Sequence, residues 1–189
     1  MRARQLILVR HAKAGWGGHG ITTDFDRELT PSGCREAVAL GARLFPLIPR
    51  PDAVVTSPAP RALTTATLLS ATWPDAPPLT IEADLYDAPL GGPAACVSDF
   101  DDAWNTVILV GHNPSISHCA DWLIGEPTVL ELPTAGVVLL KLACSHWHDV
   151  APGCGQLQSL EALEVEVEVL AAAAGPQAST PVRTPRIGS

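Results

Sequence analysis

Two histidines in this chain each follow a short run of apolar residues. The first is His11, with Arg10 directly before it, and the second is His112, which stands between Gly111 and Asn113. An apolar run of this length indicates a buried strand, so each histidine is expected at the carboxyl end of a strand. In open α/β sheets, ligands bind at these strand ends. An imidazole can attack phosphorus and a guanidinium fits phosphate oxygens, so the two motifs predict a phosphate site that contains a nucleophile.

A second arginine, Arg61, follows a third apolar run and stands near the start of a predicted helix. If the sheet is parallel at these strands, Arg10 and Arg61 can hold the non-bridging oxygens of a phosphoryl group. His112 can then donate to the equatorial oxygens of the transition state. Nearby cations, with Lys13 as a further candidate, lower the pKa of His11 and keep it unprotonated. No metal or other cofactor is expected, because the arginines and His112 supply the positive field.

The elements that must position these residues alternate between strands and helices. Strands are predicted at residues 5–10, 53–56, 106–110 and 136–142, and the last is hydrophobic throughout, as an internal strand is. Helices are predicted at residues 30–45, 57–73 and 114–123, with a threonine cap and a proline opening the first. Residues 75–80 are expected to be loop, residues 81–86 a short strand or the approach to one, and residues 87–103 loop with a weakly marked helix. This alternation predicts an α/β sheet.

The last part of the chain has a different composition. Residues 164–169 alternate strictly between glutamate and valine, which predicts a half-exposed edge strand. From residue 171 onward small residues and proline dominate and aromatic residues are absent, which indicates a disordered tail. The expected organisation is therefore one domain over residues 1–170 and a tail over residues 171–189.

The composition also narrows the class of partners. A net charge of −8 argues against a binder of nucleic acid or of membrane surfaces, because both need a basic face. With 189 residues, 47% of them hydrophobic, the chain can bury a sizeable core. Five cysteines form an odd set without close pairing, which indicates reduced thiols. No apolar run is long enough for a secretory signal or a membrane-spanning helix, so a cytoplasmic location is expected.

The motifs, in their order along roughly residues 5–142, resemble the histidine phosphatase superfamily, whose mark is Arg-His-Gly or Arg-His-Ala near the N-terminus. More narrowly, they are similar to the small bacterial phosphohistidine phosphatases of the SixA type. The matching segments are residues 6–14, 26–30, 57–66, 85–86, 110–114 and 132–137. The resemblance implies a phosphoglycerate-mutase-like fold: a single compact domain with three layers, α/β/α, around a mostly parallel sheet.

The resemblance also implies a role for each matching residue. His11 is the nucleophile that becomes phosphorylated, and Arg10 and Arg61 bind the phosphoryl group. His112 is the second pocket histidine and stabilises the transition state. The backbone amide of Asn113 is a further candidate for the pocket. The implied activity is metal-independent phosphate hydrolysis through a phosphohistidine intermediate.

The proton donor is not fixed by the motifs. Larger members of the superfamily use a Glu or Asp after the second helix, where this chain has Glu82, Asp84 and Asp87. Asp87 is the favoured candidate, because it follows Leu85 and Tyr86. A phosphoramidate leaving group needs little help from an acid, whereas an alkoxide needs much more.

Three functions therefore stay open. The favoured one is removal of phosphate from phosphohistidine in a protein such as a phosphorelay domain. The second is a phosphatase or mutase for a small phosphorylated metabolite, which a working acid at Asp87 would favour. The third is a non-catalytic phosphate-binding module, against which the intact set of two arginines and two histidines speaks.

Two further patterns are given no function. Residues 15–20 formally match G-x-G-x-x-G, but no helix start follows, so a loop beside the pocket is expected rather than a dinucleotide site. His118 is expected to pack within its helix. Another group has a spacing that fits no strong zinc pattern and is interpreted as ordinary surface residues: Cys144, His146, His148 and Cys154.

Overall fold

The computed structural model describes residues 4–17, 22–127 and 131–159. The sheet at its centre has six strands in the order β3-β2-β4-β1-β5-β6. These strands are β1 (Arg4–Arg10), β2 (Ala53–Thr56), β3 (Leu79–Ile81), β4 (Thr106–Gly111), β5 (Val137–Leu142) and β6 (Gly155–Ser159). The neighbours from β3 to β1 run parallel, whereas β5 is antiparallel to β1, and β6 is antiparallel to β5. The predicted α/β fold with a mostly parallel sheet is confirmed.

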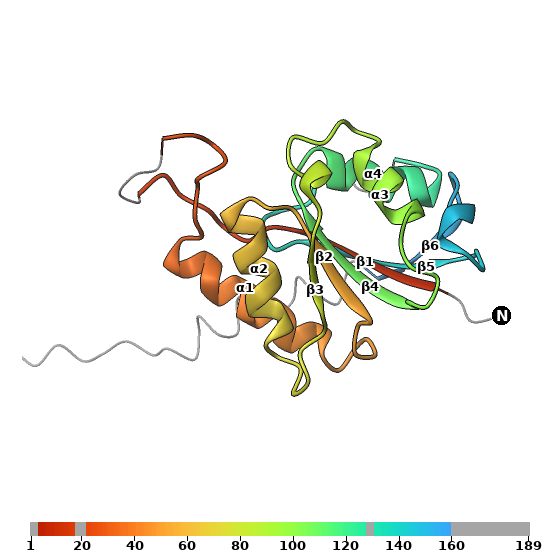
Figure 1. Cartoon of the computed structure of the whole chain (residues 1–189), viewed down its shortest axis with the longest axis horizontal. Coiled ribbons are helices and arrows are strands. Elements are labelled where there is room, and N and C mark those ends of the chain that lie inside the picture. Colours follow the sequence, from red (N-terminus) through yellow and green to blue (C-terminus); the bar gives the residue numbers. More distant parts are fainter. Residues whose placement is uncertain (1–3, 18–21, 128–130, 160–189) are drawn as a thin grey trace, which may run out of the picture.

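Helices cover both faces of the sheet and give the fold three layers. They are α1 (Pro31–Leu44), α2 (Pro60–Ser70), α3 (Gly92–Ser98) and α4 (Ser115–Ile124). α1 and α2 lie on one face, and α3 and α4 lie on the other (Figure 1). Successive residues of β1 alternate between two cores, so Ile7 and Val9 pack with α1 and α2 while Leu6 and Leu8 pack with α4. None of the described helices is both long and apolar enough to cross a membrane.

The two helices on one face, α1 and α2, begin differently: α1 has a side-chain cap and α2 has none. Thr30 caps α1 as predicted, and its Oγ1 accepts a hydrogen bond of 3.0 Å from the N–H of Gly33. α2 begins at Pro60, three residues later than the predicted start at Ser57, and has no side-chain cap. Ala59 has a ψ of 133°, outside the helical region, as is usual for a residue before proline, and the Ser57 hydroxyl is hydrogen-bonded to His112. A residue that reads as a helix signal in the sequence belongs to the site.

Three segments, namely β3, residues 81–86 and β6, depart from the sequence expectations. β3 lies where residues 75–80 were expected to be loop, because its three residues pair with β2 directly after a proline-rich stretch. Residues 81–86, expected to be a short strand or the approach to one, contain the last residue of β3 and a short 3₁₀ helix, η1 (Ala83–Leu85). β6 was not predicted, since its sequence is mostly polar, yet it pairs with β5 at the sheet edge. The predicted edge strand at residues 164–169 and the tail lie outside the described residues.

β5 is internal, as its uniform hydrophobicity predicts, because β1 and β6 flank it. An apolar run carries no information about strand direction, so its antiparallel orientation could not be predicted. This orientation places the start of β5 beside the carboxyl end of β1, where Val137 pairs with Val9. The loop before β5 therefore reaches the edge of the sheet at which the histidine motifs end.

Candidate active site

Three strand ends meet at one edge because β2, β4 and β1 are parallel neighbours. In the β1–β4 register Arg10 lies beside Gly111, and the N–H of His11 donates to the carbonyl of Gly111 over 3.0 Å. The next residue after each strand is a histidine, so the rings of His11 and His112 approach with their centroids 5.1 Å apart. On the other side of β4, the N–H of Ser57 donates to a β4 carbonyl over 3.2 Å. The three predicted motifs therefore share one edge.

His11 is buried, and its ring is held in one tautomer. Its Nδ1 lies 2.8 Å from the carbonyl oxygen of Ala12. A carbonyl can only accept, so Nδ1 carries the proton and Nε2 keeps its lone pair. Burial lowers the pKa of His11 to about 4, helped by the charges of Arg61 and Arg10 and opposed by the hydrogen bond to Ala12. The ring is neutral at neutral pH, with Nε2 available as a nucleophile.

His112 is oriented by Ser57. Its Nε2 lies 2.8 Å from the Ser57 hydroxyl oxygen, which also accepts a hydrogen bond of 3.3 Å from the N–H of Ala59. A hydroxyl can also donate, and in the tautomer in which Ser57 donates to Nε2 the ring proton of His112 sits on Nδ1. Nδ1 is buried and has no partner among the described residues. Burial, and after it the charges of His11 and Arg61, lowers the pKa of His112 to about 3. The ring is neutral, and in this tautomer its Nδ1–H is an unused donor.

Both predicted arginines lie close enough to affect the histidines, and both are fixed by other parts of the chain. Arg10 donates from Nη1 to the carbonyl of Leu132 over 2.6 Å. Arg61 is only 4% exposed, and its two terminal nitrogens donate to the carbonyl of Asp24 at 2.5 Å and to its carboxylate at 2.7 Å. The Nε of each arginine is buried without a partner among the described residues. Buried unpaired donors are rare, and a phosphoryl oxygen is a group that could pair with them.

Asp24 and Arg27 belong to the same cluster but were not identified as site residues from the sequence. Arg27 donates from Nη1 to the Asp24 carboxylate over 2.9 Å, and its guanidinium lies 5.1 Å from the ring centre of Trp16. The charge of Arg27 also lowers the pKa of His11, and its Nε is buried and unpaired. The available signal was the matching segment at residues 26–30, which contains this arginine.

The remaining pocket candidates have different surroundings. The side chain of Asn113 donates to the carbonyl of Leu132 over 2.9 Å and accepts from the hydroxyl of Ser117 over 2.8 Å. Arg10 uses the same carbonyl, so Asn113 positions the loop that holds Arg10. Lys13 is exposed, and its N–H donates to a carboxylate of α1 over 3.0 Å. The structure therefore gives Asn113 a supporting contact and leaves the Lys13 side chain at the surface.

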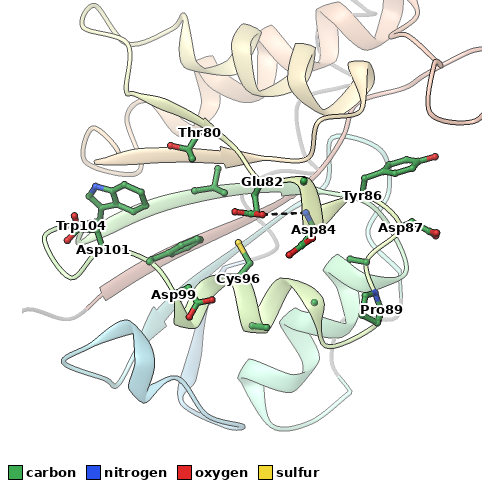
Figure 2. Close-up of a pocket in the computed structure, with 16 residues that line it drawn as sticks. Thr80, Glu82, Asp84, Tyr86, Asp87, Pro89, Cys96, Asp99, Asp101 and Trp104 are labelled. Atoms are coloured by element: carbon green, nitrogen blue, oxygen red, sulfur yellow. Dashed lines mark hydrogen bonds between the residues drawn. The ribbon is translucent and has the colours of Figure 1, made fainter.

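Asp87, the predicted proton donor, is exposed and lines a cleft of about 830 Å³. Its neighbour Tyr86 packs edge-on against His112, with ring centroids 5.8 Å apart. Figure 2 shows Tyr86 and Asp87 at one end of this cleft and Trp104 at the other. The two histidines do not line the cleft, and no described contact joins Asp87 to either of them. Asp87 is therefore next to a site residue, rather than in contact with the nucleophile.

Comparisons with known proteins agree with this geometry. The sequence model of the histidine phosphatase superfamily (branch 1) matches residues 6–93. An uncharacterised protein of Mycobacterium tuberculosis is 37% identical over 158 residues, which cover 79% of this chain and 96% of the relative.

Two solved structures carry the name phosphohistidine phosphatase SixA. The one from Nakamurella multipartitia has a TM-score of 0.70 at 30% identity and covers 83% of this chain and 94% of its own. The one from Agrobacterium tumefaciens has a TM-score of 0.69 at 25% identity and covers 82% and 96%.

Fold, site and similarity together define a class of enzyme: a phosphohydrolase built on a phosphoglycerate-mutase-like sheet. The chain belongs to the histidine phosphatase superfamily, and its similarity to solved structures points to the SixA-type branch.

Proposed function

We propose that this protein removes phosphate from phosphohistidine in a partner protein, through a phosphohistidine intermediate on His11 and without a metal ion. The observation that carries the proposal is the state of His11: a buried, neutral ring with its proton fixed on Nδ1 by the carbonyl of Ala12. This tautomer presents the lone pair of Nε2 beside two arginines. A nucleophile in a cationic pocket suits phosphoryl transfer.

The reaction has two steps. In the first, Nε2 of His11 attacks phosphorus, the bond from phosphorus to the substrate nitrogen breaks, and the leaving imidazole keeps the electron pair and takes a proton from water. In the second, water attacks the phosphorus of phosphorylated His11 and loses a proton to solvent. The bond from phosphorus to Nε2 breaks, its electron pair returns to the ring of His11, and inorganic phosphate leaves. Arg10 and Arg61 bind the phosphoryl oxygens in both steps, and their positive charge takes the place of a metal ion.

His112 acts as a donor to the moving phosphoryl group. With Ser57 donating to Nε2, the proton of His112 lies on Nδ1, which is buried and has no partner among the described residues. A donor held in place before the reaction stabilises the charge on the equatorial oxygens without having to reorganise. Ser57 is a positioning residue, because its hydroxyl holds Nε2 of His112 and leaves Nδ1 for the phosphoryl group.

Neither carboxylate considered near the pocket is placed or protonated to act as a general acid, which favours a substrate whose leaving group needs little help from an acid. Asp24 lies against Arg61, but its pKa is held below the usual range, mainly by its hydrogen bond to Arg27, so it is ionised and cannot donate a proton at neutral pH. Asp87 has no described contact with His11 or His112. The leaving group of a phosphoramidate needs little help from an acid, whereas the alkoxide of an alkyl phosphate ester needs much more.

The cleft beside Tyr86 supports the same substrate class. Its lining contains five carboxylates and no lysine or arginine, so it repels an anionic metabolite such as a nucleotide or a multiply phosphorylated sugar. The carboxylates are Glu82, Asp84, Asp87, Asp99 and Asp101. The names of the two similar solved structures add support, since both are called phosphohistidine phosphatases.

A substrate panel tests this proposal. A phosphohistidine peptide, a sugar phosphate and a nucleotide are compared by initial rates of phosphate release, with and without EDTA. We expect the phosphohistidine peptide to be preferred by at least about a hundredfold in kcat/KM, with no loss in EDTA. Preference for the sugar phosphate or the nucleotide would instead indicate a small-ester phosphatase. Phosphate binding without turnover of any substrate would indicate a non-catalytic module, and loss of activity in EDTA would contradict the metal-free mechanism.

A further inference from the structure

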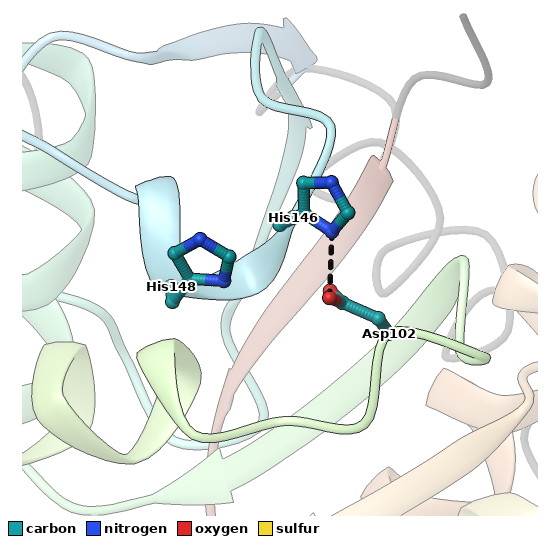
Figure 3. Close-up of side chains that lie close together, drawn as sticks. All are labelled: Asp102, His146 and His148. Carbon is teal, nitrogen blue, oxygen red and sulfur yellow. Dashed lines mark hydrogen bonds and ion pairs between the residues drawn. The ribbon is translucent and has the colours of Figure 1, made fainter.

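A second cluster of side chains, of types that bind metal ions, lies at the other end of the central strands from His11, where β1 and β4 begin. It consists of Asp102, which precedes β4, and His146 and His148, which follow β5 (Figure 3). Their ligand atoms all lie within 4.8 Å of one another. The two segments are brought together by the sheet, because Arg4 at the start of β1 pairs with the last residue of β5. The cysteines considered with these histidines in the sequence do not belong to the cluster.

Asp102 is held in a fixed orientation. Its Oδ1 accepts hydrogen bonds from Arg4 Nη2 at 2.7 Å and from the N–H of Trp147 at 3.0 Å. The Arg4 side chain is only 5% exposed, so this support is part of the folded core. The other oxygen, Oδ2, is left to face His146, whose Nδ1 lies 2.7 Å away. Supports of this kind orient the ligands of metal sites in proteins.

The two histidines are fixed by the residue between them. Trp147 is fully buried, and its indole N–H donates to the carbonyl of Trp104 over 3.0 Å. His146 and His148 flank this anchor and reach the surface, where their rings stack with centroids 5.2 Å apart and an interplanar angle of 24°. The carboxylate of Asp149 lies 3.3 Å from Nε2 of His148 and adds a second negative charge beside the pair.

From this geometry we infer a binding site for a divalent transition-metal ion at Asp102, His146 and His148. Two imidazoles and one carboxylate suit Zn²⁺, Ni²⁺, Co²⁺ or Cu²⁺, whereas Mg²⁺ and Ca²⁺ prefer oxygen ligands alone. The ion replaces the hydrogen bond between Asp102 and His146, and Nδ1 of His146 gives its proton to solvent when it binds the ion. The His148 side chain is 68% exposed, so it is free to turn toward the ion. Water fills the remaining positions.

The bound ion would join the connection between β5 and β6 to the segment before β4. It would lie at the edge of the sheet opposite to His11, so it stabilises the fold and takes no part in phosphoryl transfer. The inference is independent of the proposed function and of its metal-free mechanism. Its signature is a metal-dependent rise in the melting temperature with unchanged turnover.

The test is thermal unfolding of the EDTA-treated full chain with added ZnCl₂ or MgCl₂. Zn²⁺ at about a hundred times its Kd is expected to raise Tm by about 5 °C or more, while Mg²⁺ has no effect. The double variant His146→Ala with His148→Ala should lose this rise and keep its melting temperature without metal, because both side chains are exposed. His118→Ala is the matched control: this histidine is also exposed, contrary to the packing role expected from the sequence, and should leave the rise intact.

Binding of Co²⁺ separates this site from others in the chain. The expected absorption spectrum of the Co²⁺ form has d–d bands but no thiolate charge-transfer band, and it disappears in the double variant. A thiolate band, or Zn²⁺ stabilisation that survives in the double variant, would place the ion at a cysteine or at His11 and His112 and overturn the inference. Absence of any Tm rise with millimolar Zn²⁺ would overturn it as well.

Discussion

The protein contains two pairs of histidines, which lie at opposite ends of the central strands of one sheet. The two rings of each pair are almost equally far apart. The centroids of His11 and His112 are separated by 5.1 Å, and those of His146 and His148 by 5.2 Å. The first pair is mostly buried beside arginines, whereas the second is exposed beside carboxylates. Spacing alone therefore does not determine what a pair of imidazoles can do.

Burial and neighbouring charge make the difference. At the carboxyl edge, burial and positive charge keep His11 neutral and favour an anionic ligand. At the other edge, Asp102 and Asp149 supply negative charge where water has access, which favours a cation. The first pair is suited to attack and donate at phosphorus, and the second to share lone pairs with a metal ion.

Removing an arginine beside the buried histidine pair is expected to have the largest effect on activity. In Arg61→Ala the phosphoryl group loses a buried donor, so kcat/KM for a phosphohistidine peptide should fall by about 10²–10³-fold. Arg61→Lys restores the charge but not the fork of donors and should recover only part of this loss. Arg50→Ala, at an exposed arginine, is the control and should keep full activity. Steady-state kinetics would contradict the assignment if Arg61→Ala stayed within threefold of the wild type.

The second prediction concerns the pH at which the two buried histidines become protonated. With a pKa of about 4, His11 is mostly neutral at pH 5, whereas an unperturbed histidine would be only about 3% neutral there, a difference of roughly thirtyfold in active nucleophile. NMR titration of the ring protons should show His11 neutral down to about pH 4 and His112 down to about pH 3. A midpoint near 6.5 for His11 would show that burial does not control its charge.

The same shifts make stability depend on pH. Between pH 6.5 and about 4 the unfolded chain binds protons at His11 and His112, while the folded chain does not. The folded state is therefore expected to lose stability as the pH falls through this window. Urea unfolding at pH 7 and pH 5 measures this loss, and His112→Asn should reduce its size. Equal dependence in the variant and the wild type would contradict the contribution of His112.

Removing the hydrogen bond that orients His112 should have a smaller effect on activity. Ser57→Ala removes the hydroxyl that holds Nε2 of His112, so kcat should fall by about tenfold with little change in KM. The pH titration of His112 gives a readout specific to its surroundings and should shift in the variant. A loss confined to thermal stability, with normal kcat and an unchanged titration, would reduce Ser57 to a structural residue.

The smallest effect is expected at the exposed carboxylate. Asp87→Asn should change phosphohistidine hydrolysis by less than about twofold, because the leaving imidazole needs little acid. Asparagine tolerates the positive φ of 53° found at this residue, so the backbone should be unaffected. Asp84→Asn, at another exposed residue of the same cleft, is the matched control. A selective loss with phosphate esters would give Asp87 the role of an acid and favour a small-ester substrate.

The sequence was most informative about segments in which apolar residues form a buried strand. Apolar runs marked β1, β2, β4 and β5, and the parallel order of the first three explains why the motifs meet. It was least informative where a side chain serves a distant partner. Ser57 stands at a predicted helix start but holds His112, and Asp24 was not identified from the sequence but holds Arg61. The polar strand β6 depends on pairing with β5, which no local pattern reveals.

The central claim is that His11 becomes phosphorylated during turnover. A rapid-quench experiment with a ³²P-labelled phosphohistidine peptide should trap label that is acid-labile and stable to base, and mass spectrometry should locate it on His11. His11→Ala should show no such label and lose activity by roughly a thousandfold or more, while the exposed-site variant His146→Ala should label normally. Label on another residue, or hydrolysis at the wild-type rate by His11→Ala, would contradict the account.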